Sequence, residues 1–237
     1  GSFYLARGSF QSFYLILTII AFIGFLLLLF FLREPKSQLQ EIKSKSFITQ
    51  LKEILKFVFD TRVILLVPSS IATGFIFGLI TAKIPLTIQS LYGASLIGFL
   101  LIIFQITRII LTHPMGVISD KIGRFRMKYI EILIGIAGAI CFLLNKNIWA
   151  LIATLFAFGV DYVIKESNGP ALSLDLFEEQ VQEASAASSL IGTFGGVIPA
   201  FLLSAVKTEN YLITIAIIFS IIGLVCIKIL ETKEKHV

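Results

Sequence analysis

The sequence predicts an all-α membrane protein with seven transmembrane helices, and three observations support this fold class. Hydrophobic residues make up 57% of the 237-residue chain and charged residues only 15%, with a mean hydropathy of +0.93, which is too apolar for an ordinary soluble domain. Seven stretches are long and apolar enough to cross a bilayer as helices of about 20 residues. These stretches lack the alternation of apolar and polar residues that strands of a membrane barrel show. They cover residues 10–32, 63–89, 91–111, 129–144, 148–168, 185–206 and 211–230.

The first predicted helix ends in the sequence Arg-Glu-Pro at residues 33–35, where proline stops the helix and the charges meet water. We assign residues 1–32 to a single transmembrane helix and residues 33–62 to a cytoplasmic linker. Since the chain begins without methionine, we expect it to be part of a longer protein.

Residues 46–60 of the linker carry apolar side chains at helical spacing, with lysines on the opposite side. This pattern predicts an amphipathic helix that lies at the cytoplasmic surface of the membrane. A partly solvated extension of the next transmembrane helix explains the pattern equally well.

Residues 63–230 form the predicted six-helix transmembrane bundle, and residues 231–237 form a cytoplasmic tail. The six helices divide after residue 144 into two units of three. Because three is odd, the second unit enters the membrane in the opposite direction to the first, as in the inverted repeats of many secondary transporters. The sequence therefore predicts two inverted three-helix repeats.

Most of the 20 lysines and arginines fall in the linker, in the tail and in alternate loops between them. Such residues favour the cytoplasmic side of a membrane. This bias places the amino end of the chain outside the cell membrane and the carboxyl end in the cytoplasm. The net charge of +5 then reflects topology and contact with membrane lipid, and we expect no nucleic-acid partner.

The residue types that carry catalysis or hold metals are not arranged for either task. Cys141 and Cys226 lie in apolar stretches without a histidine or cysteine at ligand spacing, and no nucleophile–base pair is visible. We therefore predict no enzyme activity, no metal site and no cofactor, and we assign both cysteines to helix packing.

The most distinctive stretch is polar and lies between the second and third helices of the bundle. It covers residues 113–128 and reads HPMGVISDKIGRFRMK. The residues at fixed spacing are Gly116, Asp120, Gly123 and Arg124. This spacing resembles the cytoplasmic-loop signature of the major facilitator superfamily, whose carboxyl-terminal half carries a copy at this place. Phe125 stands where that family usually has a basic residue, and Arg126 supplies the charge one position later.

The resemblance covers the whole chain, as the sixth helix of that family followed by its carboxyl-terminal six-helix bundle. It implies half of a secondary active transporter that moves a small-molecule solute by alternating access, with the missing amino-terminal bundle as its partner. We favour proton-coupled export by an antiporter in the inner membrane. Two alternatives stay open: a proton- or sodium-coupled symporter of a nutrient, and a non-transporting membrane sensor or assembly subunit.

We expect the signature to act as a conformational latch formed by Gly116, Asp120, Gly123, Arg124 and Arg126. Glycine at position 116 allows close approach of a neighbouring helix, and Asp120 and Arg124, four residues apart, can pair on one helical turn. By resemblance, Asp120 lies against the amino end of the helix that begins near Ser185, where a negative charge gains about 0.3–1 kcal/mol from the helix dipole. The alternative is a solvated basic turn that only sets topology.

Charged residues inside predicted helices are costly in a membrane and indicate a functional site. If the helix that starts at residue 148 continues to Leu176, Asp161 and Lys165 lie near its middle on one face, with Glu166 beside them. The resemblance implies that this helix lines the central cavity, so that Asp161 binds a proton or cation and Lys165 is its partner or binds an anion. If the helix instead ends before its Gly-Pro pair, the cluster lies at the membrane surface.

Four more polar residues lie in or near the predicted helices. Arg108 lies about 12 Å into the membrane, counted from the signature at 1.5 Å per residue, and is a candidate partner of Asp161. Lys83 lies about 10 Å from the centre of its helix, where snorkelling to the outer headgroups and a cavity role explain it equally well. We predict Glu131 at the interface and His113 at the edge of the loop.

Overall fold

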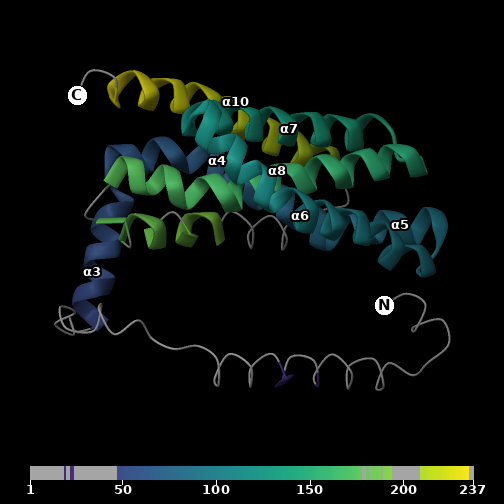
Figure 1. Ribbon diagram of the computed structural model, residues 1–237. Helices are drawn as coiled ribbons and strands as arrows, with labels where there is room; N and C mark the ends of the chain where they lie inside the picture. The colour runs from purple at the N-terminus through teal and green to yellow at the C-terminus, as the bar shows by residue number, and fades with distance from the viewer. Residues whose placement is uncertain are drawn as a thin grey trace.

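The computed structural model describes residues 19, 22–23, 47–177, 180–181, 183–187, 189–193 and 209–234, and the regular elements in them are helices. Five of these described helices are long and apolar enough to cross a membrane: Thr61–Tyr92, Ser95–Ile122, Arg124–Leu144, Ile148–Phe177 and Asn210–Glu234. They lie side by side in one bundle (Figure 1). The all-α prediction is thus confirmed for the described residues. The predicted helix at 10–32 and most of the one at 185–206 lie outside them, so the count of seven stays a prediction.

Helix α3, Phe47–Val58, leaves one end of the bundle at a steep angle (Figure 1). Two residues separate it from the next helix, which is capped by the Asp60 carboxylate through a hydrogen bond of 2.8 Å from the Arg62 amide. The linker helix is therefore separate from the transmembrane helix and does not extend it. Its place at the membrane surface stays a prediction.

The first long helix of the bundle contains a π-helical turn between two α-helical segments. It comprises α4, Thr61–Gly78, a π-helical turn η1, Leu79–Lys83, and α5, Ile84–Tyr92. Pro85 follows the wide turn directly. Because proline has no amide hydrogen and crowds the carbonyl four residues before it, regular α-helical bonding is interrupted there. Gly93 ends the helix with a φ of +88°, which other residues rarely adopt.

The polar stretch between the second and third long helices is helical, so the predicted loop is wrong. Helix α6, Ser95–Ile122, continues well past its predicted end, and α7, Arg124–Leu144, begins after a single residue. That residue, Gly123, has φ 95° and ψ 145° and breaks the helix without a loop. Hydropathy marks where a helix leaves the apolar layer and not where the helix ends, so the polar turns of α6 went unrecognised.

Helix α8, Ile148–Phe177, passes through Pro170 without ending. The alternative in which this helix stops at its Gly-Pro pair is therefore wrong, and its middle falls next to Asp161. At its start, the Asn147 side chain accepts a hydrogen bond of 2.8 Å from the Ala150 amide. This bond satisfies one of the free N–H groups of the first turn and sets where the helix begins.

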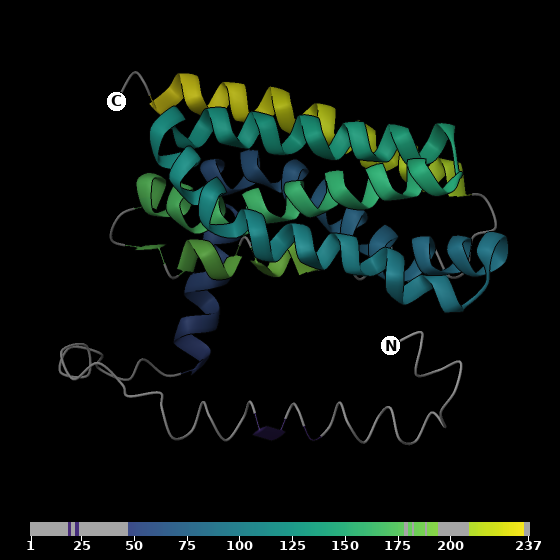
Figure 2. The same ribbon diagram turned by 45° about the vertical axis from the view of Figure 1, so that its right-hand side comes forward.

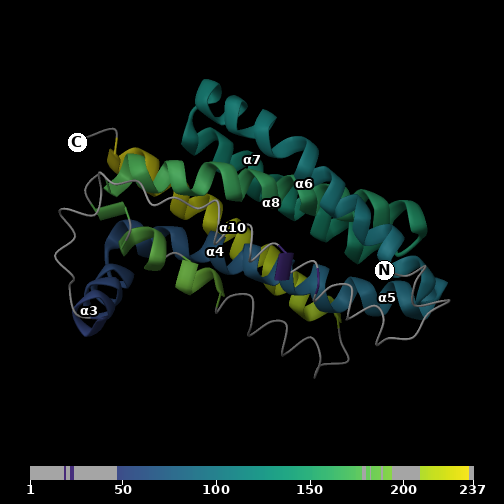
Figure 3. The ribbon, with the colours of Figure 1, turned by 60° about the horizontal axis from the view of Figure 1, so that its bottom comes forward.

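Helix α8 packs along α6 and α7, and the last helix, α10 (Glu209–Glu234), packs along α4 and α7 (Figure 2, Figure 3). Glycines allow the closest contacts. A Cβ on Gly138 of α7 would meet the Phe158 ring at 2.8 Å, and one on Gly159 of α8 would meet Thr107 of α6 at 2.8 Å. In two inverted repeats, the first helices α4 and α8 would correspond, and so would the last helices α7 and α10. The packing of α4 on α10 is then matched by the packing of α8 on α7, as such repeats require. The repeat itself stays a prediction, because most of the middle helix of the second unit lies outside the described residues.

Candidate functional site

A cavity of about 600 Å³ lies between α4, α8 and residues 185–193. Charged side chains reach it at Lys128 of α7 and at Lys165 and Glu166 of α8. Hydroxyl groups make up most of its remaining polar lining, from Ser69, Ser70, Thr73, Thr81, Ser173, Ser185, Ser189 and Thr193. Small-molecule sites commonly have volumes of about 300–1,000 Å³. The cavity is therefore the candidate solute site.

Asp161 lies beside this cavity, on the side of α8 that faces α7. The residue is only 2% exposed, and a Cβ on Gly135 of α7 would be 2.9 Å from its Oδ1, so glycine leaves room for the carboxylate. The other oxygen, Oδ2, is buried without a hydrogen-bond partner among the described residues. The charges that act on it come from Glu131 and Lys128 of α7 and from Lys165 of its own helix.

Two residues of α7 form a buried ion pair near Asp161. The Lys128 ammonium lies 2.5 Å from Oε1 of Glu131, and the two residues are 7% and 1% exposed. Oε2 of Glu131 has no hydrogen-bond partner within the described part of the chain. The prediction that Lys128 belongs to a loop is therefore wrong, because it lies in α7, and the interfacial position of Glu131 stays a prediction. The two residues lie three apart on one helix, which lets each neutralise the other inside the bundle.

Lys165 is partly buried and extends across the cavity toward Gly192, where a Cβ would be 3.8 Å from the lysine Nζ. The charges of Lys128, Glu131, Asp161 and Glu166 act on it. Among the described residues, however, no carboxylate is close enough to form an ion pair with its ammonium group.

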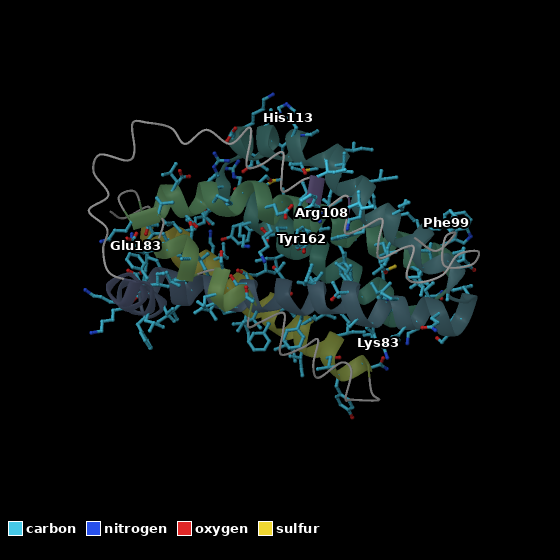
Figure 4. The ribbon with its side chains drawn as sticks, turned by 90° about the horizontal axis from the view of Figure 1, so that it is seen from below. Lys83, Phe99, Arg108, His113, Tyr162 and Glu183 are labelled. Carbon is cyan, nitrogen blue, oxygen red and sulfur yellow. The ribbon has the colours of Figure 1, made fainter. Side chains whose placement is uncertain are left out.

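Arg108 pairs with Glu166 and not with Asp161, which corrects the sequence-based expectation. Its Nη2 donates to both carboxylate oxygens of Glu166, at 2.9 and 3.0 Å. The guanidinium lies 4.5 Å from the centre of the Tyr162 ring, and the two side chains are neighbours in Figure 4. A helix turns by about 100° per residue, so positions 161 and 166 point to different sides of α8. Asp161 therefore faces α7 while Glu166 meets α6.

Lys83 and His113 lie away from the cavity. Lys83 is the last residue of η1 and is not part of the cavity wall, and Figure 4 shows it at the opposite edge of the bundle from His113. His113 is exposed on the outer side of α6. Lys83 is therefore outside the wall of this cavity, and its snorkelling stays a prediction.

The signature residues meet α8 in a hydrogen-bond network at the helix break. Asn168 of α8 is fully buried; its amide donates to the Arg124 carbonyl at 3.1 Å, and its side-chain oxygen accepts from the Ser119 hydroxyl at 2.7 Å. The same hydroxyl accepts a hydrogen bond of 3.0 Å from the Arg124 guanidinium. Helices α6, α7 and α8 are thus joined at the helix break that Gly123 makes.

Arg124 also forms the ion pairs of the signature. Its Nη2 lies 2.5 Å from Oδ1 of Asp120, and its Nε lies 3.8 Å from Oδ2 of Asp175 on α8. The expected partners Asp120 and Arg124 therefore meet across the helix break and not on one helical turn. A Cβ on Gly116 would meet no described atom within 4 Å, so the close approach expected there involves none of the described residues. The contact of Asp120 with the helix near Ser185 stays a prediction.

Most of the chain, including the signature stretch, lies within a match to a known family. The family model of the Major Facilitator Superfamily matches residues 1–202. This chain belongs to the Major Facilitator Superfamily. It is therefore a multi-pass protein of a family of membrane transporters for small-molecule solutes, and not of a family of enzymes. A comparison with curated proteins found no match.

In this superfamily member, sequence reasoning missed the Lys128–Glu131 pair and the bond between Ser119 and Asn168. Two signals could have found them. Lysine and glutamate three residues apart are spaced for an ion pair, and an asparagine within a transmembrane helix needs a hydrogen-bond partner. Arg126, the remaining signature residue, is exposed. The described residues contain no group of three His, Cys, Asp or Glu that could hold a metal ion.

Proposed function

We propose that the chain is the carboxyl-terminal half of a proton-coupled secondary active transporter that moves a small solute by alternating access. One observation carries the proposal. Oδ2 of Asp161 is buried without a partner among the described residues, behind a cavity wall that includes Tyr162 and Lys165.

A buried carboxylate oxygen without a hydrogen bond is costly, and buried polar atoms are usually partnered. A proton on Asp161 would remove one negative charge from a buried cluster that also contains Glu131, Lys128 and Lys165. Binding and release of that proton therefore change the net charge of the bundle next to the solute cavity. Such a change is what coupling to a proton gradient requires.

The cavity lies on one face of the bundle, so a second bundle is needed to close it on one side and open it on the other. The signature then acts as the latch: Arg124 and Asn168 hold α6, α7 and α8 in one arrangement, which must loosen in the other. In this proposal the amino end lies outside the inner cell membrane and the carboxyl end lies in the cytoplasm. The segments are the last helix of the first bundle, the linker, the second bundle and the tail, at residues 1–32, 33–62, 63–230 and 231–237.

Two directions of coupling remain as proposals. Export in exchange for protons is the direction that we favour from the sequence. Symport is the second candidate, and the position of Lys165 in the cavity wall favours it. A non-transporting sensor predicts no polar cavity beside Lys165 and Glu166, so the cavity supports a transporter instead.

Reconstitution of the full-length protein tests the proposal. Liposomes that contain the protein and a pH-sensitive dye receive sugars, amino acids, organic amines and organic acids one at a time, with and without sodium. With the wild-type protein we expect at least one solute to change the lumenal pH in the absence of sodium. With Asp161→Asn we expect none to do so.

Glu234→Gln is the matched control, because it removes a carboxylate from the end of α10, away from the cavity wall. Proton movement should be unchanged in this variant. Solute-driven proton movement that persists in Asp161→Asn would remove Asp161 from the mechanism. A strict requirement for sodium would contradict proton coupling.

A further inference from the structure

We infer that the cavity binds a small organic monocarboxylate through Lys165, and that this anion crosses the membrane together with the proton of Asp161. The inference rests on the proposed function, because it takes Asp161 as the proton site. It adds the class of solute and the direction of the proton relative to that solute.

The first argument is the balance of charges around the cavity. Glu166 is paired with Arg108 at 2.9 Å, and Lys128 is paired with Glu131 at 2.5 Å. These four charges already have partners of opposite sign. Of the charged groups in the cavity wall, Lys165 is left without an ion pair in the described part of the chain. A solute in the cavity therefore meets one ammonium group that has no ion-pair partner among the described residues.

The second argument is position. Lys165 lines the cavity and reaches toward Gly192, whereas Asp161 does not line it and packs against Gly135 of α7. A cationic solute in the cavity would meet the ammonium group of Lys165 and would not touch Asp161, which is not part of the wall. An anionic solute reaches Lys165 directly.

The third argument is the set of hydrogen-bond donors. Four of the lining hydroxyls, those of Ser69, Thr73, Thr81 and Thr193, donate to carbonyl groups of their own helices. The other four form no side-chain hydrogen bond with any described residue, and they are Ser70, Ser173, Ser185 and Ser189. A carboxylate accepts hydrogen bonds at both oxygens, so these hydroxyls and the lysine ammonium suit a hydroxylated carboxylate.

The coupling follows from three buried groups, Lys128, Glu131 and Asp161, and the partly buried Lys165. When all are ionised, Lys128 and Lys165 balance Glu131 and Asp161. A proton on Asp161 leaves one excess positive charge, and one carboxylate bound at Lys165 cancels it. The proton and the anion therefore favour each other's binding and travel in the same direction. This predicts symport without net charge movement, in contrast to the antiport that we favour from the sequence.

The test uses the full-length protein in liposomes with a lumenal pH dye and three poorly permeating carboxylates, glycerate, gluconate and shikimate. Each is compared with its amide, and glucosamine and inorganic phosphate are added as a cation and a different anion. We expect at least one carboxylate to enter with acidification of the lumen, and its amide not to enter. Clamping the membrane potential with potassium and valinomycin should leave the rate unchanged.

Variants of Lys165 assign the site. Lys165→Gln should raise the half-saturating carboxylate concentration about 10- to 100-fold, since it removes a hydrogen bond to a charged group. Lys165→Arg keeps the charge and should retain most of the transport, which also shows that the position tolerates substitution. Lys233→Gln removes an exposed lysine from the last turn of α10, away from the cavity wall and the signature, and should change nothing.

The inference is overturned if none of the carboxylates enters, if amides, glucosamine or phosphate enter as well as the carboxylates, or if Lys165→Gln transports normally. Proton-coupled entry of glucosamine alone would overturn it and leave the proposed function intact. Carboxylate entry that depends on Lys165 but moves no protons would instead contradict the proposed role of Asp161.

Discussion

Two groups of polar side chains in this chain differ in how far they are buried and in how completely they are partnered. The corner cluster consists of Ser119, Asp120, Arg124, Asn168 and Asp175. The central cluster consists of Lys128, Glu131, Asp161 and Lys165. The corner cluster joins α6, α7 and α8 at a helix break, and its charges are partly exposed, with 63% of the Asp120 side chain and 25% of the Arg124 side chain accessible.

The buried atoms of the corner cluster have their hydrogen bonds, since Asn168 both donates and accepts. The central cluster is buried yet incomplete: one oxygen each of Glu131 and Asp161 lacks a hydrogen bond, and Lys165 lacks an ion pair, among the described residues. Polar groups that have all their hydrogen bonds fix the arrangement of the helices that they join. Buried polar groups that lack a partner indicate where a proton or solute binds. The corner cluster is therefore suited to hold helices together, and the central cluster is suited to change its charge.

The largest expected effect is in the central cluster. Glu131→Gln leaves the Lys128 ammonium buried without its carboxylate, which should lower the free energy of unfolding by about 3–5 kcal/mol. Thermal unfolding of the purified protein in detergent measures the loss. Replacing both residues with methionine removes both charges and should restore most of the stability. If the single variant is as stable as the wild type, the pair does not support the central cluster.

Asn168→Ala tests whether the corner cluster depends on its buried hydrogen bonds. The change removes the side-chain donor to the Arg124 carbonyl and the acceptor of the Ser119 hydroxyl, and should cost about 2–3 kcal/mol of stability. Asp175→Asn, which weakens only an exposed ion pair of 3.8 Å, should cost less than about 1 kcal/mol. Equal thermal shifts for the two variants would show that the network is not what joins the helices.

Gly123→Ala tests the backbone of the same corner. At φ 95° and ψ 145° a Cβ is strained, so alanine should destabilise the protein by about 1–3 kcal/mol. Gly116→Ala lies within α6 with no described atom near its Cβ, and should be neutral or stabilising by up to about 1 kcal/mol. The matched pair is compared by thermal unfolding, and the reverse order would contradict the assigned role of Gly123.

The smallest effect is expected for Asp120→Asn. Its ion pair with Arg124 is exposed, so its loss should cost about 0–1 kcal/mol and the cost should shrink at high salt. Thermal unfolding at low and high salt measures this. A loss as large as that of Glu131→Gln would show that the corner cluster is held by charge and not by hydrogen bonds.

Hydropathy predicted where the described helices cross the apolar layer, because a membrane permits only helices or closed barrels and their apolar stretches are read from local sequence. It predicted the ends poorly. The stretch from 112 to 122 contains polar residues such as Ser119, Asp120 and Lys121 and is still helical, since a helix can continue into water, and Gly123 interrupts it. The charges inside predicted helices also led to Asp161 and Lys165, which the structure places at the centre of α8.

By itself, then, the sequence determined the helical class, the signature and the charged residues inside the membrane, since each depends on neighbours along the chain. The tertiary structure alone decided their partners on other helices: Arg108 meets Glu166, and Asp161 packs on Gly135. The reason is the direction in which each side chain leaves its helix. Each residue turns a helix by about 100°, so the partner of a side chain depends on how whole helices pack, and no local pattern carries that information.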